Sequence, residues 1–375
     1  MIFPQQTDTD ELFTGYESER LPSETDPFCN DTENSLYSES YSRILPAFFF
    51  RTAKCGKKPS RYEKKNLRYY YNTSGIILAS KLFIEAASCA VFYIFMFLCS
   101  TAFTSSQSLY YSALSDETIK YSFRILAAII STASVFFAGC RFSSLSPGSL
   151  MKKCDKIKTT DIVICFMTGL FISGLSNVII FSEPHLTSEF GYSIINPGKD
   201  ILQITAGALY TCIVVPVTEG LIFRGIALKN FSRASQRFGI LTASFFCALS
   251  TCSFPSMIPS FLMSIVLCGL TVRYSSVIPS ILLHIAVNFC GMTISVYNSL
   301  VWGNDITLIK TWTIITLAAG GIFVIISIIK LPLPSIKSEQ RRRGIPLLIS
   351  SPFAVLLIPL YICSALAEIL YFMYR

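Results

Sequence analysis

The sequence has few charged residues, two histidines and no pair of cysteines at the CxxC spacing. Charged residues make up 14% of its 375 residues, against roughly 25% in a soluble globular protein. Because zinc clusters of the cysteine and histidine type need several such ligands at short spacing, the sequence does not support a zinc site. We therefore expect no metal cofactor, and the composition argues against a soluble domain.

The thirteen cysteines also lack the pattern of a disulfide scaffold. Most of them lie inside apolar runs, where a free thiol packs as a small hydrophobic group. These are Cys89, Cys99, Cys165, Cys212, Cys247, Cys268, Cys290 and Cys363. The net charge of +8 comes mainly from loops beside these runs, and no aromatic and basic residues form the pattern of a nucleic-acid groove. We expect no nucleic-acid partner.

Long apolar runs dominate what remains. Hydrophobic residues make up 52% of the chain, mean hydropathy is +0.53, and several runs exceed the length that crosses a bilayer. Lipid offers the backbone no hydrogen bonds, so these spans are expected to be helices. The sequence predicts an all-α polytopic membrane protein, located in the cell or inner membrane. Nine helices are expected at about 76–103, 122–140, 161–182, 203–226, 238–254, 257–272, 277–300, 308–329 and 346–372.

The chain divides into three regions. Residues 1–50 are expected to be a disordered acidic tail, with ten acidic residues among the first forty and no signal peptide pattern. Residues 51–72 form a basic juxtamembrane segment, with eight Lys or Arg between 51 and 68, which is expected to contact anionic lipid. A specific partner site is the alternative. Residues 73–375 form the transmembrane domain, with its functional core at about 200–300.

Loop charges predict the orientation of the chain. With the N-terminus in the cytoplasm, the inside segments carry eight, five, three, one and five basic residues, and each outside segment carries one or none. This alternation follows the positive-inside rule. It predicts a cytoplasmic N-terminus, an external C-terminus and a tight hairpin between the fifth and sixth spans.

Charged residues inside membrane spans are costly and mark functional sites. Three of them have a structural explanation from the sequence: Glu85 lies four residues after Lys81, and Arg124 and Glu368 lie near span ends. Glu219 and Arg224 lack such an explanation, because they lie in the middle of an apolar run, in the segment TEGLIFRG.

The segment that holds them is irregular. Pro216 precedes Glu219, and glycines occupy positions 220 and 225. Proline removes a backbone hydrogen bond, and glycine permits close approach of another chain. We therefore expect a distorted helix at this point.

His284 and Asn288 form a second polar pair. They are four residues apart in LLHIAVN and so share one face of a helix. An imidazole and an amide at this spacing suit an oxyanion site, while a carboxylate on another helix activates water. A hydrogen-bonded contact between helices is the alternative.

These motifs resemble those of the CAAX protease and bacteriocin-processing (Abi or CPBP) family of intramembrane endopeptidases. The family carries EExxxR, then FxxxH, then HxxxN, and here Glu219 to Arg224 resemble the first motif and His284 to Asn288 the third. Phe246 to Ser250 stand where the second is expected. The resemblance covers roughly residues 200–300. It implies that Glu219 activates water with support from Arg224, and that His284 and Asn288 hold the oxyanion.

Two departures from the family pattern bear on activity. Gly220 replaces the second glutamate of the first motif. Ser250 replaces the histidine of the second motif, which in the family helps to activate water. The resemblance therefore leaves two interpretations open: an intramembrane endopeptidase impaired by Ser250, or a catalytically dead pseudoprotease that acts as a membrane binding or immunity-type protein. The expected partners are membrane lipid and a membrane-associated or lipidated peptide. A proton-coupled transporter is a third interpretation, but no inverted repeat supports it.

Overall fold

The computed structural model describes residues 61–103, 116–151, 157–182, 200–233, 235–301, 306–330 and 345–373. Almost all of this part is helical, and it contains no β-strand, so the predicted all-α class is confirmed. The expected acidic tail lies outside the described residues, as does the basic segment up to residue 60. Helices outside the functional core are α3 (Arg61–Phe103), α5 (Glu117–Phe142), α6 (Pro147–Leu150), α7 (Thr159–Ser182), α15 (Ile306–Lys330) and α17 (Pro352–Met373).

The functional core contains three further helical units. The first is one continuous helix made of α9 (Ile201–Ala208), η3 (Leu209–Val214), α10 (Val215–Glu219), η4 (Gly220–Ala227) and α11 (Leu228–Phe231). The second is the pair α12 (Gln236–Leu249) and α13 (Phe254–Tyr274), which pack against one another as the expected hairpin. The third is α14 (Ile278–Val301).

Seven helices in the described residues are long and apolar enough to cross a membrane. The chain is thus a multi-pass integral membrane protein, but the predicted count of nine spans is not confirmed. Helix α12 has 14 residues and spans about 21 Å, less than the hydrocarbon core of roughly 30 Å.

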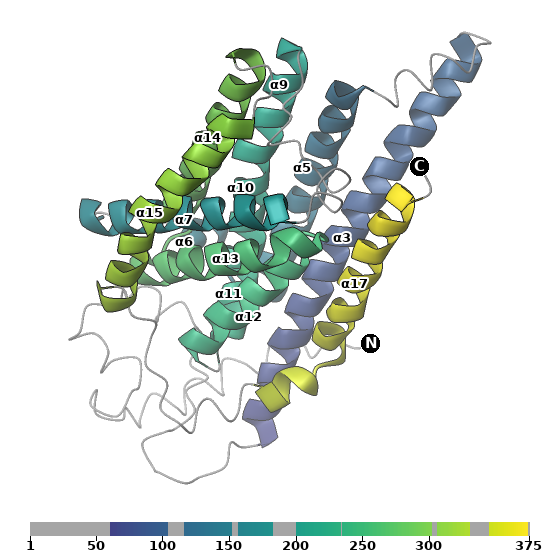
Figure 1. Ribbon diagram of the computed structural model, residues 1–375. Helices are drawn as coiled ribbons and strands as arrows, with labels where there is room; N and C mark the ends of the chain where they lie inside the picture. Colours follow the sequence, from purple (N-terminus) through teal and green to yellow (C-terminus); the bar gives the residue numbers. More distant parts are fainter. Residues whose placement is uncertain are drawn as a thin grey trace.

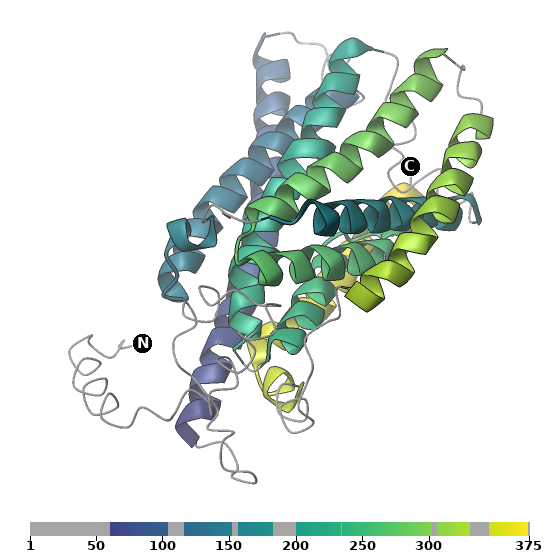
Figure 2. The ribbon, with the colours of Figure 1, turned by 90° about the vertical axis from the view of Figure 1, so that its left-hand side faces the viewer.

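The helices run in two main directions. In both ribbon views α7 and α13 lie across the direction of α3 and α5, while α17 runs beside α3 (Figures 1 and 2). Helix α7 packs against α13, α14 and α15. Helices α7 and α13 therefore cross the bundle beside the segment that holds Glu219.

Glycines permit the closest contacts between helices. A Cβ added to Gly75 on α3 would lie 2.5 Å from the backbone carbon of Phe353 on α17. A Cβ on Gly320 of α15 would lie 2.8 Å from the carbonyl oxygen of Met167 on α7. Such close backbone packing by small residues is typical of membrane helices.

Two buried polar clusters hold the helices together away from Glu219. Asp161 Oδ2 at the start of α7 accepts hydrogen bonds from Arg273 Nε at 2.8 Å and from the Tyr274 hydroxyl at 2.7 Å. Asn230 Nδ2 on α11 donates to Ser74 Oγ at 3.0 Å and to Ser143 Oγ at 2.8 Å. Each cluster connects helices that are distant in sequence.

Of the other intramembrane charges, Glu85 has the expected local partner. Lys81 Nζ lies 2.7 Å from Glu85 Oε2, within one turn of α3. The side chain of Glu368 lies outside the described part of the structure.

Candidate active site

Glu219 lies where two irregular helical segments meet. In η3 and η4 the backbone hydrogen bonds reach five residues back, as from Val215 to the Tyr210 carbonyl and from Leu228 to the Phe223 carbonyl. Such wide turns bring residues five apart toward one face and are frequent at functional sites. The geometry explains why a glutamate and an arginine five positions apart meet: η4 begins directly after Glu219 and contains Arg224.

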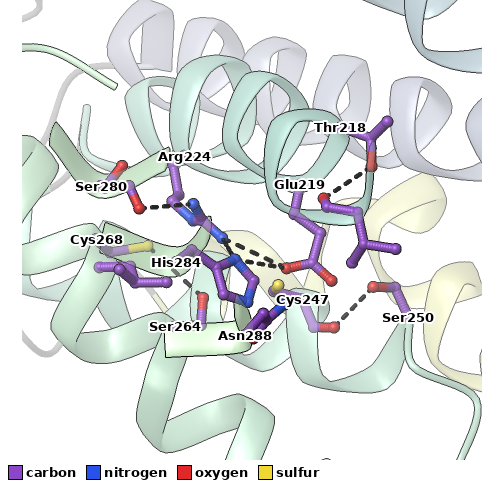
Figure 3. A network of polar contacts seen from close by, with 12 residues as sticks. Thr218, Glu219, Arg224, Cys247, Ser250, Ser264, Cys268, Ser280, His284 and Asn288 are labelled. Carbon is purple, nitrogen blue, oxygen red and sulfur yellow. Dashed lines mark hydrogen bonds and ion pairs between the residues drawn. The ribbon is translucent and has the colours of Figure 1, made fainter. Parts of the chain in front are cut away.

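Arg224 connects Glu219 with α14. Its side chain is fully buried, and its Nη2 lies 3.4 Å from Glu219 Oε2 and 2.8 Å from His284 Nδ1. Its Nη1 donates to the backbone carbonyl of Ser280 at 3.5 Å. Figure 3 shows the guanidinium beside both the carboxylate and the imidazole. A single arginine thus fixes the carboxylate of one helix against the imidazole of another.

The contact with Arg224 determines which nitrogen of His284 carries a proton. A guanidinium has only donors, so Nδ1 of His284 must accept. The imidazole is therefore neutral, with its proton on Nε2. Glu219 Oε2 lies 3.8 Å from Nδ1, which places carboxylate and imidazole within reach of one small ligand while Nε2–H remains available as a donor.

Asn288 lies one turn beyond His284 on α14. One of its amide hydrogens is already used, because Nδ2 donates to the backbone carbonyl of Thr211 at 2.8 Å. The amide has a second hydrogen. The predicted pair of His284 and Asn288 thus offers one imidazole N–H and one amide N–H.

These side chains line one cavity of about 310 Å³. Its wall includes Glu219, Arg224, His284 and Asn288, so the structure brings four of the predicted site residues together. Five serines on α7 and α13 also line the wall, among apolar residues such as Met263, Leu267 and Val287, and the three on α13 recur every four residues. The serines are Ser173, Ser176, Ser256, Ser260 and Ser264.

The two residues expected to form the second motif, Phe246 and Ser250, do not line the cavity. Ser250 does not line the cavity, because it ends α12 and its hydroxyl donates back to the Cys247 carbonyl at 2.7 Å. Phe246 is buried elsewhere, stacked on Phe231 with ring centroids 5.6 Å apart. The residues that do line the cavity from this part of the chain are Cys247 and Thr251.

A shift of one residue turns a helical side chain by about 100°, since an α-helix has 3.6 residues per turn. Sequence spacing alone does not resolve that difference. The sequence does show that Cys247 and Thr251 are also four residues apart. The serines of α13 were visible as a four-residue repeat, but nothing in the sequence placed them opposite Glu219.

Gly220 is required by its surroundings. A Cβ at this position would clash with Cγ1 of Ile281 on α14 and lie 3.5 Å from Arg224 Nη1. The second glutamate of the family motif therefore has no room here while Ile281 stays in place. Arg224 pairs with Glu219 and His284 instead.

The residues do not fit a tightly bound metal ion. No group of three or more His, Cys, Asp or Glu close enough to hold one occurs among the described residues. Two potential metal ligands, Glu219 and His284, lie near each other, but both contact the cationic Arg224. A metal ion would have to compete with a positive charge for the same two groups.

Comparison with known proteins supports the resemblance. A family model described as type II CAAX prenyl endopeptidase Rce1-like matches residues 201–290, which run from the start of α9 into α14 and include Glu219, Arg224, His284 and Asn288. No curated protein and no solved structure matches the chain. Residues 201–290 are therefore similar to the Rce1-like domain of the CAAX protease family that the motifs indicated.

Proposed function

We propose that this protein is an intramembrane endopeptidase of the CAAX type, which hydrolyses a peptide bond near the membrane surface. One observation supports this proposal: Glu219, His284 and Asn288 line the same cavity inside a membrane domain. A carboxylate to activate water and two N–H donors for an oxyanion are the groups that peptide hydrolysis needs.

The reaction follows from these positions. Glu219 accepts a proton from water as the water oxygen bonds to the substrate carbonyl carbon. The carbonyl oxygen becomes negative and accepts hydrogen bonds from His284 Nε2–H and Asn288 Nδ2–H. The carbon–nitrogen bond then breaks, and the proton on Glu219 passes to the leaving amine. The products are one peptide ending in a carboxylate and one beginning with an amine.

Arg224 acts through its neighbours in this scheme. By donating to His284 Nδ1 at 2.8 Å it keeps the proton on Nε2, where the oxyanion needs a donor. By contacting one oxygen of Glu219 at 3.4 Å it stabilises the ionised carboxylate, which is the form that accepts a proton.

The substrate is proposed to be a membrane-associated or lipidated peptide. The cavity lies in a membrane domain, and its serine hydroxyls suit the polar main chain of a peptide. We place the protein in the cell or inner membrane with a cytoplasmic N-terminus, as the loop charges favour. Membrane lipid surrounds the helices, whose outward residues are largely aliphatic, as at Ile325 and Ile328 of α15.

A specific observation also favours a second candidate, a pseudoprotease that binds a membrane partner without cleaving it. His284 is the one histidine among the residues that line the cavity in the described part of the chain. Cys247 and Thr251 stand where a second water-activating group is expected, and a threonine hydroxyl is a weak base. Under this interpretation the retained groups hold a peptide carbonyl but activate water poorly.

A cleavage assay separates the two candidates. Purified wild type and Glu219→Gln are reconstituted in liposomes and incubated with a quenched-fluorescence peptide library, with and without a lipid anchor on the peptides. Cleavage by wild type that is lost in Glu219→Gln supports the endopeptidase. Binding of peptides by both proteins without cleavage supports the pseudoprotease.

A further inference from the structure

Asn288 has a second role that follows from a missing backbone hydrogen bond. In η3 the amide of Val215 donates to the Tyr210 carbonyl, five residues back. The next bond of this pattern would run from residue 216 to the Thr211 carbonyl. Residue 216 is a proline, which has no N–H. The Thr211 carbonyl is therefore left without its helical partner.

The side chain of Asn288 supplies the missing donor. Its Nδ2 lies 2.8 Å from the Thr211 carbonyl oxygen, across the gap between α14 and η3. A carbonyl inside a membrane domain cannot be satisfied by lipid, so leaving it unpaired is costly. The amide of Asn288 thus replaces the backbone amide that Pro216 lacks.

This contact connects the two halves of the candidate site. Pro216 is three residues before Glu219 in α10, and Asn288 is one turn after His284 in α14. We propose that Asn288 is a positioning residue, which holds the segment 209–219 in its irregular form and so places the Glu219 carboxylate opposite His284. The proposal rests on the Thr211 contact and does not depend on the proposed catalytic activity.

Helix geometry supports a specific pairing of Asn288 with Pro216. If alanine replaces Pro216, the new amide can bond the Thr211 carbonyl in the same five-residue pattern that Val215 follows. The donor from Asn288 then becomes dispensable for the backbone. Two residues on different helices should therefore compensate for one another, although neither is bonded to the other.

A double-mutant cycle tests this pairing. Asn288→Ala, Pro216→Ala and the double variant are purified in detergent, and hydrogen exchange is measured by mass spectrometry over residues 209–219. We expect Asn288→Ala alone to speed exchange in this segment about fivefold, the factor expected for one lost hydrogen bond. In the Pro216→Ala background the same change should have little effect.

A second measurement separates positioning from general stability. Infrared difference spectra identify the carboxyl band of Glu219 as the band that disappears in Glu219→Gln. This band should shift in Asn288→Ala and return in the double variant with Pro216→Ala. Asn177 on α7 serves as the control, because its Nδ2 donates to Thr313 Oγ1 at 3.1 Å and its removal should act equally in both backgrounds.

Conservative variants keep the test decisive if Asn288→Ala fails to accumulate. Asn288→Asp has the same shape without the amide hydrogens and is expected to loosen residues 209–219, whereas Asn288→Ser keeps a donor and is expected to hold them better. The proposal is overturned if removing Asn288 speeds exchange equally with and without Pro216, or leaves both exchange and the Glu219 band unchanged.

Discussion

Two carboxylate–arginine pairs lie in this membrane domain, and they are built differently. Asp161 and Arg273 join two helices 112 residues apart in sequence, with a contact of 2.8 Å reinforced by the Tyr274 hydroxyl. Glu219 and Arg224 belong to one irregular helix, and their contact of 3.4 Å is shared with His284. Glu219 and Arg224 line the cavity, and Asp161 and Arg273 are not among its lining residues.

The difference indicates how structural and functional charges are distinguished in such a protein. A short ion pair between helices that are distant in sequence, away from the cavity, stabilises the fold. A carboxylate with a longer contact to its arginine, beside a cavity, can still bind a ligand or accept a proton. Charged residues of both kinds look alike in the sequence, because both interrupt apolar runs.

Replacing the two carboxylates should affect cleavage differently, and the largest effect is expected at Glu219. Glu219→Gln should lower any cleavage rate by about 10² to 10⁴-fold, the usual contribution of a general base. Its unfolding temperature should also fall, because the fully buried Arg224 loses its carboxylate partner. Cleavage assays and thermal unfolding in detergent check this. A variant that cleaves normally would remove Glu219 from the mechanism.

Asp161→Asn should lower stability without a comparable loss of cleavage. Removing one charge of a buried pair leaves Arg273 unpaired, and we expect a loss of about 3 kcal/mol in the free energy of unfolding, near the lower end for such pairs because Arg273 is partly exposed. Cleavage measured well below the unfolding temperature should be little affected. Equal stability of Asp161→Asn and wild type would contradict the structural assignment of this pair.

A third variant tests how closely the Glu219 segment is packed. Gly220 lets α14 approach this segment. Gly220→Ala should destabilise the protein by about 1–3 kcal/mol, because the new methyl group clashes with Ile281. Ile281→Ala should restore much of the loss. Gly269→Ala on α13 is the matched control, since a Cβ there meets nothing within 4 Å. A similar loss at both glycines would show that the contact with Ile281 is not the cause.

The smallest effect is expected from installing a second histidine. Thr251→His places an imidazole at the cavity wall and should raise the cleavage rate by about tenfold, a partial general-base contribution. Ser250→His should not, since Ser250 is not among the residues that line the cavity. The same peptide assay compares the two variants. If only Ser250→His raises the cleavage rate, then Ser250 and not Thr251 occupies the position of the second-motif histidine, as expected from the sequence.

Much of the site could be predicted from the sequence because its chemistry is local. Glu219 and Arg224 stand out by charge in an apolar run, and His284 and Asn288 by their spacing of four residues. The all-α class followed from the apolar runs. These features need no knowledge of how the helices pack.

The remaining features depend on packing, which the sequence does not state. The sequence did not indicate that Cys247 lines the cavity and Phe246 does not. Both lie in an equally apolar context, and packing against Phe231 decides which side chain faces the cavity. The nine spans were counted by hydropathy, which does not reveal that α12 stops at 14 residues. A distorted helix around Glu219 was expected from Pro216 and the glycines, but the contact of Asn288 with this segment was not visible in the sequence.

Hydrolysis in ¹⁸O-labelled water tests the central claim most directly. Reconstituted wild type, Glu219→Gln and Thr251→His are given the same peptides, and the products are analysed by mass spectrometry. The account predicts that wild type and Thr251→His release a peptide whose new carboxylate carries one ¹⁸O atom, and that Glu219→Gln does not. Labelled product from Glu219→Gln at the wild-type rate, or no labelled product from wild type and Thr251→His, would contradict it.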